Sequence, residues 1–513
     1  MVPVVGIEFE STRIKAVFLL VLSAVSVLTA SGADDSDLAR MFVRAKVRGA
    51  LRAVAIGGSI TQDGKGWVGD WLAGRLPGCR TVMFNEGMSA TGSSLGVFRL
   101  ERDVIAAEPD LVLAEFVPND SSLSDEQAIL YLESIVVRLK SLPRPPAIVF
   151  LGAASRDHTT QARHRRVAGR YGIPFVDLQR AADEEVAARG GDWFELFKDN
   201  VHPNAKGHAV YAAAIAAALE PFVDAADTGD FPADRTLPPK LSAGDLLLDA
   251  RMSSLTHAGC GGWSPECSVG KWWDKFLNGV LVSPRTGGSR CVIPFRGTAV
   301  GLLYAMDPSN GVCYLSVDGA EPVEVNTGAR FGYQNVNLSC SLAPGEHTLT
   351  VYVPEEEHRP VKLAYLLTAG ADRPPEHEAK PRSYDGRISV RPVAAADLEW
   401  SRAEGDGWVR NTGATGRLEF ADLAPGEKLE RAFVRTAVES AEPRRAVLGV
   451  KVDYFGCVRL NGRKVYEFLP GHSVRERLFV PLDLVRGHNE IVVEVRPGSK
   501  GHFCELFWLE EEK

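Results

Sequence analysis

The sequence predicts an α/β domain followed by two antiparallel β-sandwich domains. Between about residues 51 and 219, short apolar runs alternate with helical patterns. After a proline-rich stretch at 223–242, the runs become alternating in polarity and are separated by turn residues. A second proline-rich stretch at 372–384 divides this later region in two. The chain has 513 residues, which is more than a single hydrophobic core usually accommodates and is typical of about three domains.

The first region contains five apolar runs that are typical of buried parallel strands. They are Leu51–Ile56, Thr81–Phe84, Leu111–Phe116, Ala147–Leu151 and Pro174–Asp177. Helical patterns follow at Trp67–Arg75, Ser93–Ile105, Asp125–Ser141, Thr160–Tyr171 and Leu178–Arg189, and Asn204 can cap a last helix through Leu219. This alternation predicts a parallel sheet with helices on both faces, whose ligands bind beyond the carboxyl ends of the strands.

The two later regions, 243–371 and 385–513, are predicted to be antiparallel sandwiches. Alternating runs in them are joined by tight-turn pairs such as Asp318-Gly319 and Asn461-Gly462. Three tryptophans of the first sandwich stand near two cysteines. Either a sugar-stacking platform or core and interdomain packing would explain them, and we favour packing. They are Trp263, Trp272 and Trp273.

Residues 1–33 are predicted to be a secretory signal peptide. The apolar run 16–30 follows Arg13 and Lys15, precedes small residues and is too short to span a bilayer. An N-terminal membrane anchor is the alternative. No other run is long and apolar enough for a membrane helix, and the net charge of -8 argues against a nucleic-acid partner. We therefore expect a secreted or periplasmic protein with no integral membrane span.

Export would permit disulfides among the eight cysteines. Cys79 stands alone in the first domain, and Cys457 and Cys504 fall in the third. Five cysteines fall in the second domain, so at least one of them is free or pairs across domains. A disulfide in that domain is one expectation, and a structural metal is the less favoured one.

Four short polar blocks follow strands of the first domain in a fixed order. They are Gly57-Gly58-Ser59-Ile60-Thr61, Asn85-Glu86-Gly87, Pro118-Asn119-Asp120 and Asp199-Asn200-Val201-His202-Pro203. Together they contain a nucleophile, oxyanion donors, and a base with its orienting carboxylate, which are the parts of a serine esterase. Each block lies at a strand end or in the loop after it, so all four are expected at one edge of the sheet.

Ser59 is the predicted nucleophile, because Gly57 and Gly58 allow a sharp turn and leave room for a substrate. A glycine turn followed by a helix-capping serine is the alternative. Asp199 and His202 are three residues apart, so the carboxylate can accept the Nδ1–H of the imidazole and leave Nε2 to take a proton from Ser59. A capping aspartate beside a surface histidine, or a metal pair without a third ligand nearby, would also explain this spacing.

Gly87, Asn119 and the amide of Ser59 are the predicted oxyanion donors. A simple Asx turn is the alternative for Asn119 and Asp120. The remaining histidines near these blocks are interpreted as surface or supporting groups; they are His158, His164 and His208.

Over roughly residues 50–222, these residues resemble the signature of the GDSL or SGNH hydrolases. Its four residues match Ser59, Gly87, Asn119 and His202 in order, with the D-x-x-H pair intact. The resemblance implies a flavodoxin-like three-layer fold over 40–222, no cofactor, no metal, and ester hydrolysis through an acyl-enzyme. In two places the chain departs from the family: the first block reads G-G-S without an acid before the serine, and the third reads V-P-N-D without the usual glycine.

The last domain, with its V-x-L-N-G turn and later G-x-N-x-I-x-V strand, resembles the jelly-roll domains that accompany carbohydrate enzymes. This resemblance predicts an acylated carbohydrate as substrate and a polysaccharide O-acetylesterase as function. The sandwiches are expected to target or shape the substrate and not to break bonds. The alternatives are a lipase or small-acyl-ester esterase, and a carbohydrate-binding or scaffold protein whose hydrolase domain is a relic.

Overall fold

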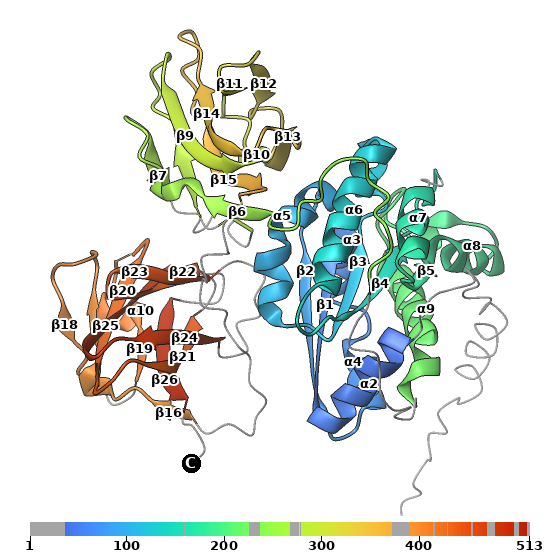
Figure 1. Cartoon of the computed structure of the whole chain (residues 1–513), viewed down its shortest axis with the longest axis horizontal. Helices are drawn as coiled ribbons and strands as arrows, with labels where there is room; N and C mark the ends of the chain where they lie inside the picture. Colours follow the sequence, from blue (N-terminus) through green and yellow to red (C-terminus); the bar gives the residue numbers. More distant parts are fainter. Residues whose placement is uncertain are drawn as a thin grey trace, which may run out of the picture.

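The computed structural model describes residues 36–157, 161–224, 236–266, 276–277, 279–371, 390–413, 416–427, 429–452, 455–468, 478–496 and 502–509. The described chain forms one α/β domain and two β-sandwiches (Figure 1). Several sequence predictions fall outside the described residues: the signal peptide, the second proline-rich stretch, His158, Cys267, Trp272 and Trp273.

The first domain has a parallel five-stranded sheet in the order β2-β1-β3-β4-β5. This is the order of flavodoxin-like folds, and it confirms the predicted fold class. All five predicted strands are present. They are β1 Ala50–Gly57, β2 Arg80–Gly87, β3 Leu111–Glu115, β4 Ala147–Gly152 and β5 Phe175–Asp177.

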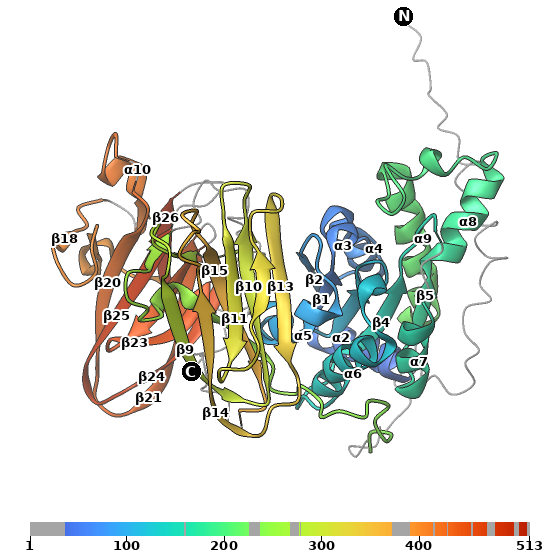
Figure 2. The ribbon, with the colours of Figure 1, turned by 90° about the horizontal axis from the view of Figure 1, so that it is seen from above.

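Helices cover both faces of this sheet (Figures 1 and 2). The predicted ones are α4 Gly69–Arg75, α5 Ser93–Asp103, α6 Asp125–Lys140, α7 Ala162–Arg170, α8 Leu178–Ala188 and α9 Ala205–Val223. Two were not predicted: α2 Ser36–Arg48 precedes the first strand, and α3 Ser59–Gly64 is too short for its periodicity to be visible. Short 3₁₀ turns are η1 Ile105–Ala107, η2 Asn119–Ser122 and η3 Trp193–Glu195.

Alternate side chains of each strand point to opposite faces of the sheet. On β1, Val54 and Ile56 join the core under α5 and α6, whereas Ala53 and Ala55 join the core under α2 and α9. The strand register brings Gly57 level with Gly87 of β2 and with Glu115 of β3. The chain segments that leave these three carboxyl ends therefore meet at one edge, as predicted.

The second domain is a sandwich of a six-stranded and a four-stranded sheet. The larger sheet runs β13-β10-β15-β8-β7 with β6 paired to β15, and the smaller runs β12-β11-β14-β9. The strands are β6 Arg251–Ser254, β7 Ser264–Glu266, β8 Val280–Val282, β9 Arg290–Gly297, β10 Ala299–Met306, β11 Val312–Val317, β12 Val323–Asn326, β13 Gly332–Ser339, β14 Gly345–Tyr352 and β15 Lys362–Ala369, with η4 at Leu255–His257.

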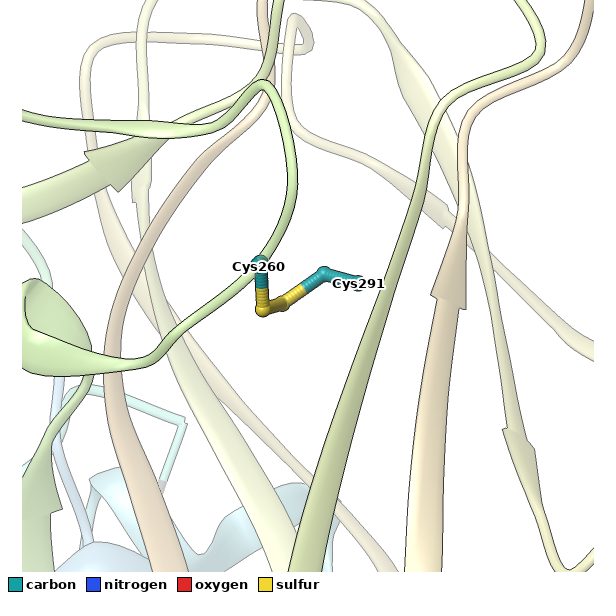
Figure 3. The surroundings of a disulfide bond; sticks show 2 residues. All are labelled: Cys260 and Cys291. Atoms are coloured by element: carbon teal, nitrogen blue, oxygen red, sulfur yellow. A yellow bond between two sulfur atoms is a disulfide. The ribbon is translucent and has the colours of Figure 1, made fainter.

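A disulfide joins Cys260 to Cys291 on β9 of this sandwich (Figure 3). Five further cysteines that the structure describes lie outside this disulfide: Cys79, Cys313, Cys340, Cys457 and Cys504. Trp263 is 7% exposed and belongs to the sandwich core, which is the packing interpretation that we favoured.

The first sandwich shares a hydrophobic core with the α/β domain. In Figure 2 its strands β10 and β13 lie beside α5, and one buried cluster continues from Leu95 and Phe98 on α5 to Leu303 and Tyr365 in the sandwich. The carboxamide of Asn337 on β13 donates to the carbonyl of Ser94 at 3.0 Å and lies 2.9 Å from the Tyr131 hydroxyl. The sandwich is thus fixed to the helices that lie next to the predicted site.

The first predicted linker, 223–242, is described only in part. Leu237 and Leu241 pack against the shared core, and the amide of Ser242 donates to the buried carboxylate of Glu133 on α6 at 2.7 Å. This part of the stretch therefore packs on the α/β domain, although its composition is that of a linker.

The third domain is a second sandwich, with sheets β16-β26-β21-β24, to which β19 adds beside β26, and β18-β17-β20-β25-β22-β23. Its elements are β16 Val390–Pro392, η5 Ala395–Asp397, β17 Glu399–Ser401, β18 Val409–Arg410, β19 Arg417–Glu419, α10 Phe420–Leu423, β20 Ala432–Ser440, β21 Arg444–Val452, β22 Phe455–Leu460, β23 Arg463–Phe468, β24 Leu478–Leu484, β25 Gly487–Arg496 and β26 Phe503–Leu509. Among all the described helices, none has the length and apolar character needed to cross a membrane.

Candidate active site

Ser59 is the first residue of α3, and Gly58 alone separates it from the end of β1. The two preceding glycines are required by close packing: a Cβ on Gly57 would lie 2.4 Å from the carbonyl oxygen of Glu115, and one on Gly58 would lie 2.1 Å from Oδ1 of Asn119. At the first helical position, the amide of Ser59 has no acceptor within the helix. Both the hydroxyl and the amide of Ser59 therefore lie at the edge of the sheet where the four blocks meet.

Ser59, His202 and Asp199 form a hydrogen-bonded chain. Oγ of Ser59 lies 2.7 Å from Nε2 of His202, and Nδ1 of His202 lies 2.8 Å from Oδ2 of Asp199. The other oxygen of Asp199 accepts the amides of Val201 and His202, both at 2.8 Å. Partial burial raises the pKa of Asp199, but these hydrogen bonds outweigh it and the pKa is lowered. The carboxylate thus stays ionised and orients the imidazole toward Ser59.

The loop that carries Asp199 and His202 is tied to the helix that begins at Ser59. The ammonium of Lys198 pairs with Asp63 on α3 at 3.0 Å, and the indole of Trp193 donates to the carbonyl of Asp199 at 2.7 Å. These contacts were not predicted, because nothing in the local pattern of Lys198, Asp63 or Trp193 marks a long-range partner.

Trp67 forms a second link between the segment that begins at Ser59 and the helix that follows His202. Its ring covers Gly64 at the end of α3, and its Nε1–H donates to Nδ1 of His208 on α9 at 3.2 Å. Its backbone φ of 52° is rare for a bulky residue. His208, whose pKa is lowered by burial, is therefore a supporting group, as one of our two interpretations had it.

Asn119 and Gly87 occupy different environments. The side chain of Asn119 lies over Gly58, next to the Ser59 turn. The amide of Gly87 donates to Oδ1 of Asn85 at 3.0 Å, and a Cβ on Gly87 would lie 2.1 Å from the amide nitrogen of Gln62 on α3. The structure thus brings Asn119 to the nucleophile, whereas Gly87 packs against α3 with its amide already engaged.

Asp120, the residue after Asn119, is a buried anchor. Its Oδ1 accepts the amide of Ser93 at 2.8 Å, and its Oδ2 lies 3.0 Å from Nε2 of His164 on α7. His164 is only 3% exposed, so it is a supporting group and the surface interpretation of it is wrong. Within the described ranges, no three His, Cys, Asp or Glu side chains are grouped as ligands for a metal ion.

Comparisons with known proteins agree with this fold. The sequence model of the GDSL-like lipase/acylhydrolase family matches residues 55–210. A solved structure of a two-domain esterase active on acetylated mannans is 22% identical, with a TM-score of 0.59, and the match covers 67% of this chain and 97% of that one. The same esterase co-crystallised with mannopentaose is also 22% identical, with a TM-score of 0.58 over 66% of this chain and 96% of that one.

At 22% identity, these two matches show that the chain shares the fold of that esterase. No curated protein matches the chain. Residues 55–210 are therefore a GDSL-like lipase/acylhydrolase domain, and the protein is a hydrolase of ester bonds.

Proposed function

We propose that the protein is a secreted serine esterase that removes O-acetyl groups from a polysaccharide through an acyl-enzyme. The observation that carries the proposal is the 2.7 Å contact between Oγ of Ser59 and Nε2 of His202, with Asp199 on the opposite side of the imidazole. In a serine esterase this contact prepares the hydroxyl for attack on an ester carbonyl.

In the proposed reaction, Ser59 attacks the carbonyl carbon while His202 takes its proton. The oxyanion that forms is held by the Ser59 amide and by the carboxamide of Asn119. His202 then gives the proton to the leaving sugar hydroxyl, and the acyl group remains on Ser59. A water molecule that His202 deprotonates releases the acid in a second, equivalent cycle. Gly87 would add a third donor once its amide leaves Asn85.

Replacing Asn119 with alanine should raise the barrier of the acylation step by about 2.7–4 kcal/mol, the cost of losing one oxyanion donor. The loss should appear in kcat more than in KM, because this hydrogen bond strengthens only as negative charge develops. Steady-state kinetics on 4-nitrophenyl acetate would measure it, with Asn326→Ala on the remote strand β12 as control. A raised KM with an unchanged kcat would make Asn119 a substrate-positioning residue instead.

Three observations support export and a carbohydrate substrate. The disulfide between Cys260 and Cys291 suits an oxidising compartment. The similar two-domain esterase acts on acetylated mannans. An exposed aromatic ring also stands beside the catalytic loop: Phe194 is 50% exposed, and the guanidinium carbon of Arg156 lies 5.3 Å from its ring centroid.

Phe194 and Arg156 are joined to the loop that carries His202, since the amide of Arg156 donates to the carbonyl of Asn200 at 2.8 Å. An apolar ring flanked by a guanidinium suits a sugar, which offers a C–H face and hydroxyl groups. We therefore place a sugar-binding position of the polymer at this pair of side chains.

Phe194→Ala should raise KM for an acetylated polysaccharide several-fold and leave kinetics on a small acetyl ester nearly unchanged, because a small ester has no sugar ring to stack on Phe194. The matched control is Phe331→Ala, which removes another exposed aromatic, 64% exposed, from the first sandwich. Acetate release across a panel of acetylated polysaccharides would measure both variants. Equal loss on polymer and small ester would contradict the assignment, and rates that rise with acyl-chain length would favour the lipase alternative.

A further inference from the structure

Glu115 lies directly beneath the turn that carries the nucleophile. It is the last residue of β3 and is 0% exposed. Its Oε2 accepts the hydroxyl of Thr61 at 3.0 Å, and the backbone amides of Gly58 and Thr61 also hydrogen-bond to its carboxylate. One buried carboxylate therefore holds both ends of the short segment from Gly58 to Thr61, with Ser59 between them.

The same turn is held from its carbonyl side by a buried arginine. Arg99 on α5 donates to the carbonyl of Gly57 at 2.9 Å and to the carbonyl of Glu86 at 2.8 Å. Glu115 accepts backbone amides and Arg99 donates to backbone carbonyls. The backbone around Ser59 is therefore hydrogen-bonded to a buried anion through its N–H groups and to a buried cation through its C=O groups. Position 58 is a glycine in this chain, so no acidic side chain next to Ser59 within the block can accept these backbone amides.

We propose that Glu115 is a positioning residue for Ser59: it fixes the turn from Gly58 to Thr61 and thereby sets the serine hydroxyl at hydrogen-bonding distance from His202. The proposal rests on Ser59 being the nucleophile, and it does not depend on the polysaccharide substrate.

The ionisation of Glu115 makes this role measurable. Burial raises its pKa to about 7, although the Thr61 hydroxyl and the Gly58 amide lower it. The titratable groups that face it are Asp120 after β3, which raises the pKa further, and Tyr211 on α9. Its Oε1 has no hydrogen-bond partner among the described residues, so a proton can reside there without displacing the donors on Oε2.

Glu115→Gln keeps an acceptor oxygen and removes the charge. Hydrogen bonds to a carboxylate are about twice as strong as those to a neutral oxygen, so the variant should react about tenfold more slowly than the wild type at about pH 8.5. At about pH 5.5 the wild-type carboxyl is itself protonated, and the two rates should agree within about twofold. The measurement is the rate at which a fluorophosphonate probe labels Ser59, together with kcat and KM on 4-nitrophenyl acetate.

Stability should change in the opposite direction to activity. Because the folded pKa of Glu115 is raised above its unfolded value, ionisation costs stability as pH rises through about 7. Glu115→Gln should therefore melt at the same temperature as the wild type, or higher, at about pH 8.5. A residue that only supports the fold would lose stability and activity together.

The matched control is Glu133→Gln, which neutralises another fully buried glutamate. Its partners are the Tyr171 hydroxyl and the amides of Leu241 and Ser242, which lie outside the Ser59 turn. Its labelling rate should stay within about twofold of wild type at both pH values. Thr61→Val removes the hydroxyl that Glu115 accepts and should also slow labelling. Combining Thr61→Val with Glu115→Gln should cost less than the sum of the single changes, as expected for partners in contact.

The outcomes separate the two proposals. If the probe does not label Ser59 in the wild type, the serine mechanism itself is wrong. If the wild type is labelled but Glu115→Gln and Thr61→Val react at wild-type rates at both pH values, the role of Glu115 is overturned. Should Glu115→Gln fail to fold, the labelling rate of Thr61→Val alone decides.

Discussion

Replacing Ser59 with alanine should lower kcat on any ester substrate by roughly 10⁴- to 10⁶-fold, with KM close to its wild-type value. The reason is that no acyl-enzyme can form without the hydroxyl, whereas the Cβ that shapes the turn is retained. The residual rate would come from the oxyanion donors, which still stabilise attack by water. Initial rates on 4-nitrophenyl acetate and a single-turnover burst would measure the loss.

The control for this variant is Ser121→Ala, which removes an exposed serine hydroxyl two residues after Asn119. It should retain wild-type rates and be labelled by a fluorophosphonate probe, whereas Ser59→Ala should not be labelled. Near-normal turnover of Ser59→Ala would rule out the serine mechanism, and acetyl transfer to another residue would then have to explain the activity.

Replacing His202 with alanine should cost nearly as much in kcat as the loss of Ser59, because the two act as one unit and their effects are not additive. Asp199→Asn should lower kcat less. The imidazole of His202, which lies 2.7 Å from the Ser59 hydroxyl, is still present in this variant, although its tautomer is no longer fixed. The measurement is kcat for each variant. The double variant that combines His202→Ala with Ser59→Ala should be no slower than Ser59→Ala alone.

Wild-type kcat/KM should fall as pH drops through about 7, because burial raises the pKa of Glu115 to that value and its protonated form holds the Ser59 turn more weakly. Asp199, whose pKa is lowered, stays ionised in this range and keeps its hydrogen bond to His202. The fall should be smaller in Glu115→Gln, and an equal fall in both proteins would contradict this explanation.

The control for the histidine variants is His347→Ala. His347 on β14 is also paired with an aspartate, its Nδ1 lying 2.6 Å from Oδ2 of Asp318, but it belongs to the first sandwich. Its loss should leave kcat and the pH profile unchanged. An equal effect of both histidine changes would point to a general loss of folding and not to a lost base.

Much of the α/β domain could be predicted because its signals are local. Parallel strands covered on both faces need continuous apolar runs, and a helix after each run needs its own period and cap. The helix α6 shows this well: it begins after Ser124, whose side chain accepts the amide of Gln127, while the Gln127 side chain accepts the amide of Ser124. The blocks at Ser59 and His202 were found in the same way, since each contains its own turn residues.

The supporting contacts of the site could not be predicted. Trp67 reaches His208 and Lys198 reaches Asp63 across more than a hundred residues of sequence, and Glu115 meets Thr61 from a neighbouring strand. None of these residue types is unusual where it stands. Gly87 shows the converse case: its place in the pattern suggests an oxyanion donor, but in the folded chain Asn85 occupies its amide.

The sequence by itself determined the order of the elements, the α/β and sandwich classes, and which residues carry a hydroxyl, an imidazole and a carboxylate to one edge of the sheet. Only the tertiary structure decided that the first sandwich shares a core with α5 and α6, that the stretch around Leu241 packs there despite its linker composition, and that Glu115 lies beneath Ser59. The physical reason is that periodicity and turn chemistry express the preferences of a few consecutive residues. Burial against a distant segment depends on the shape of both surfaces, which no single stretch of sequence contains.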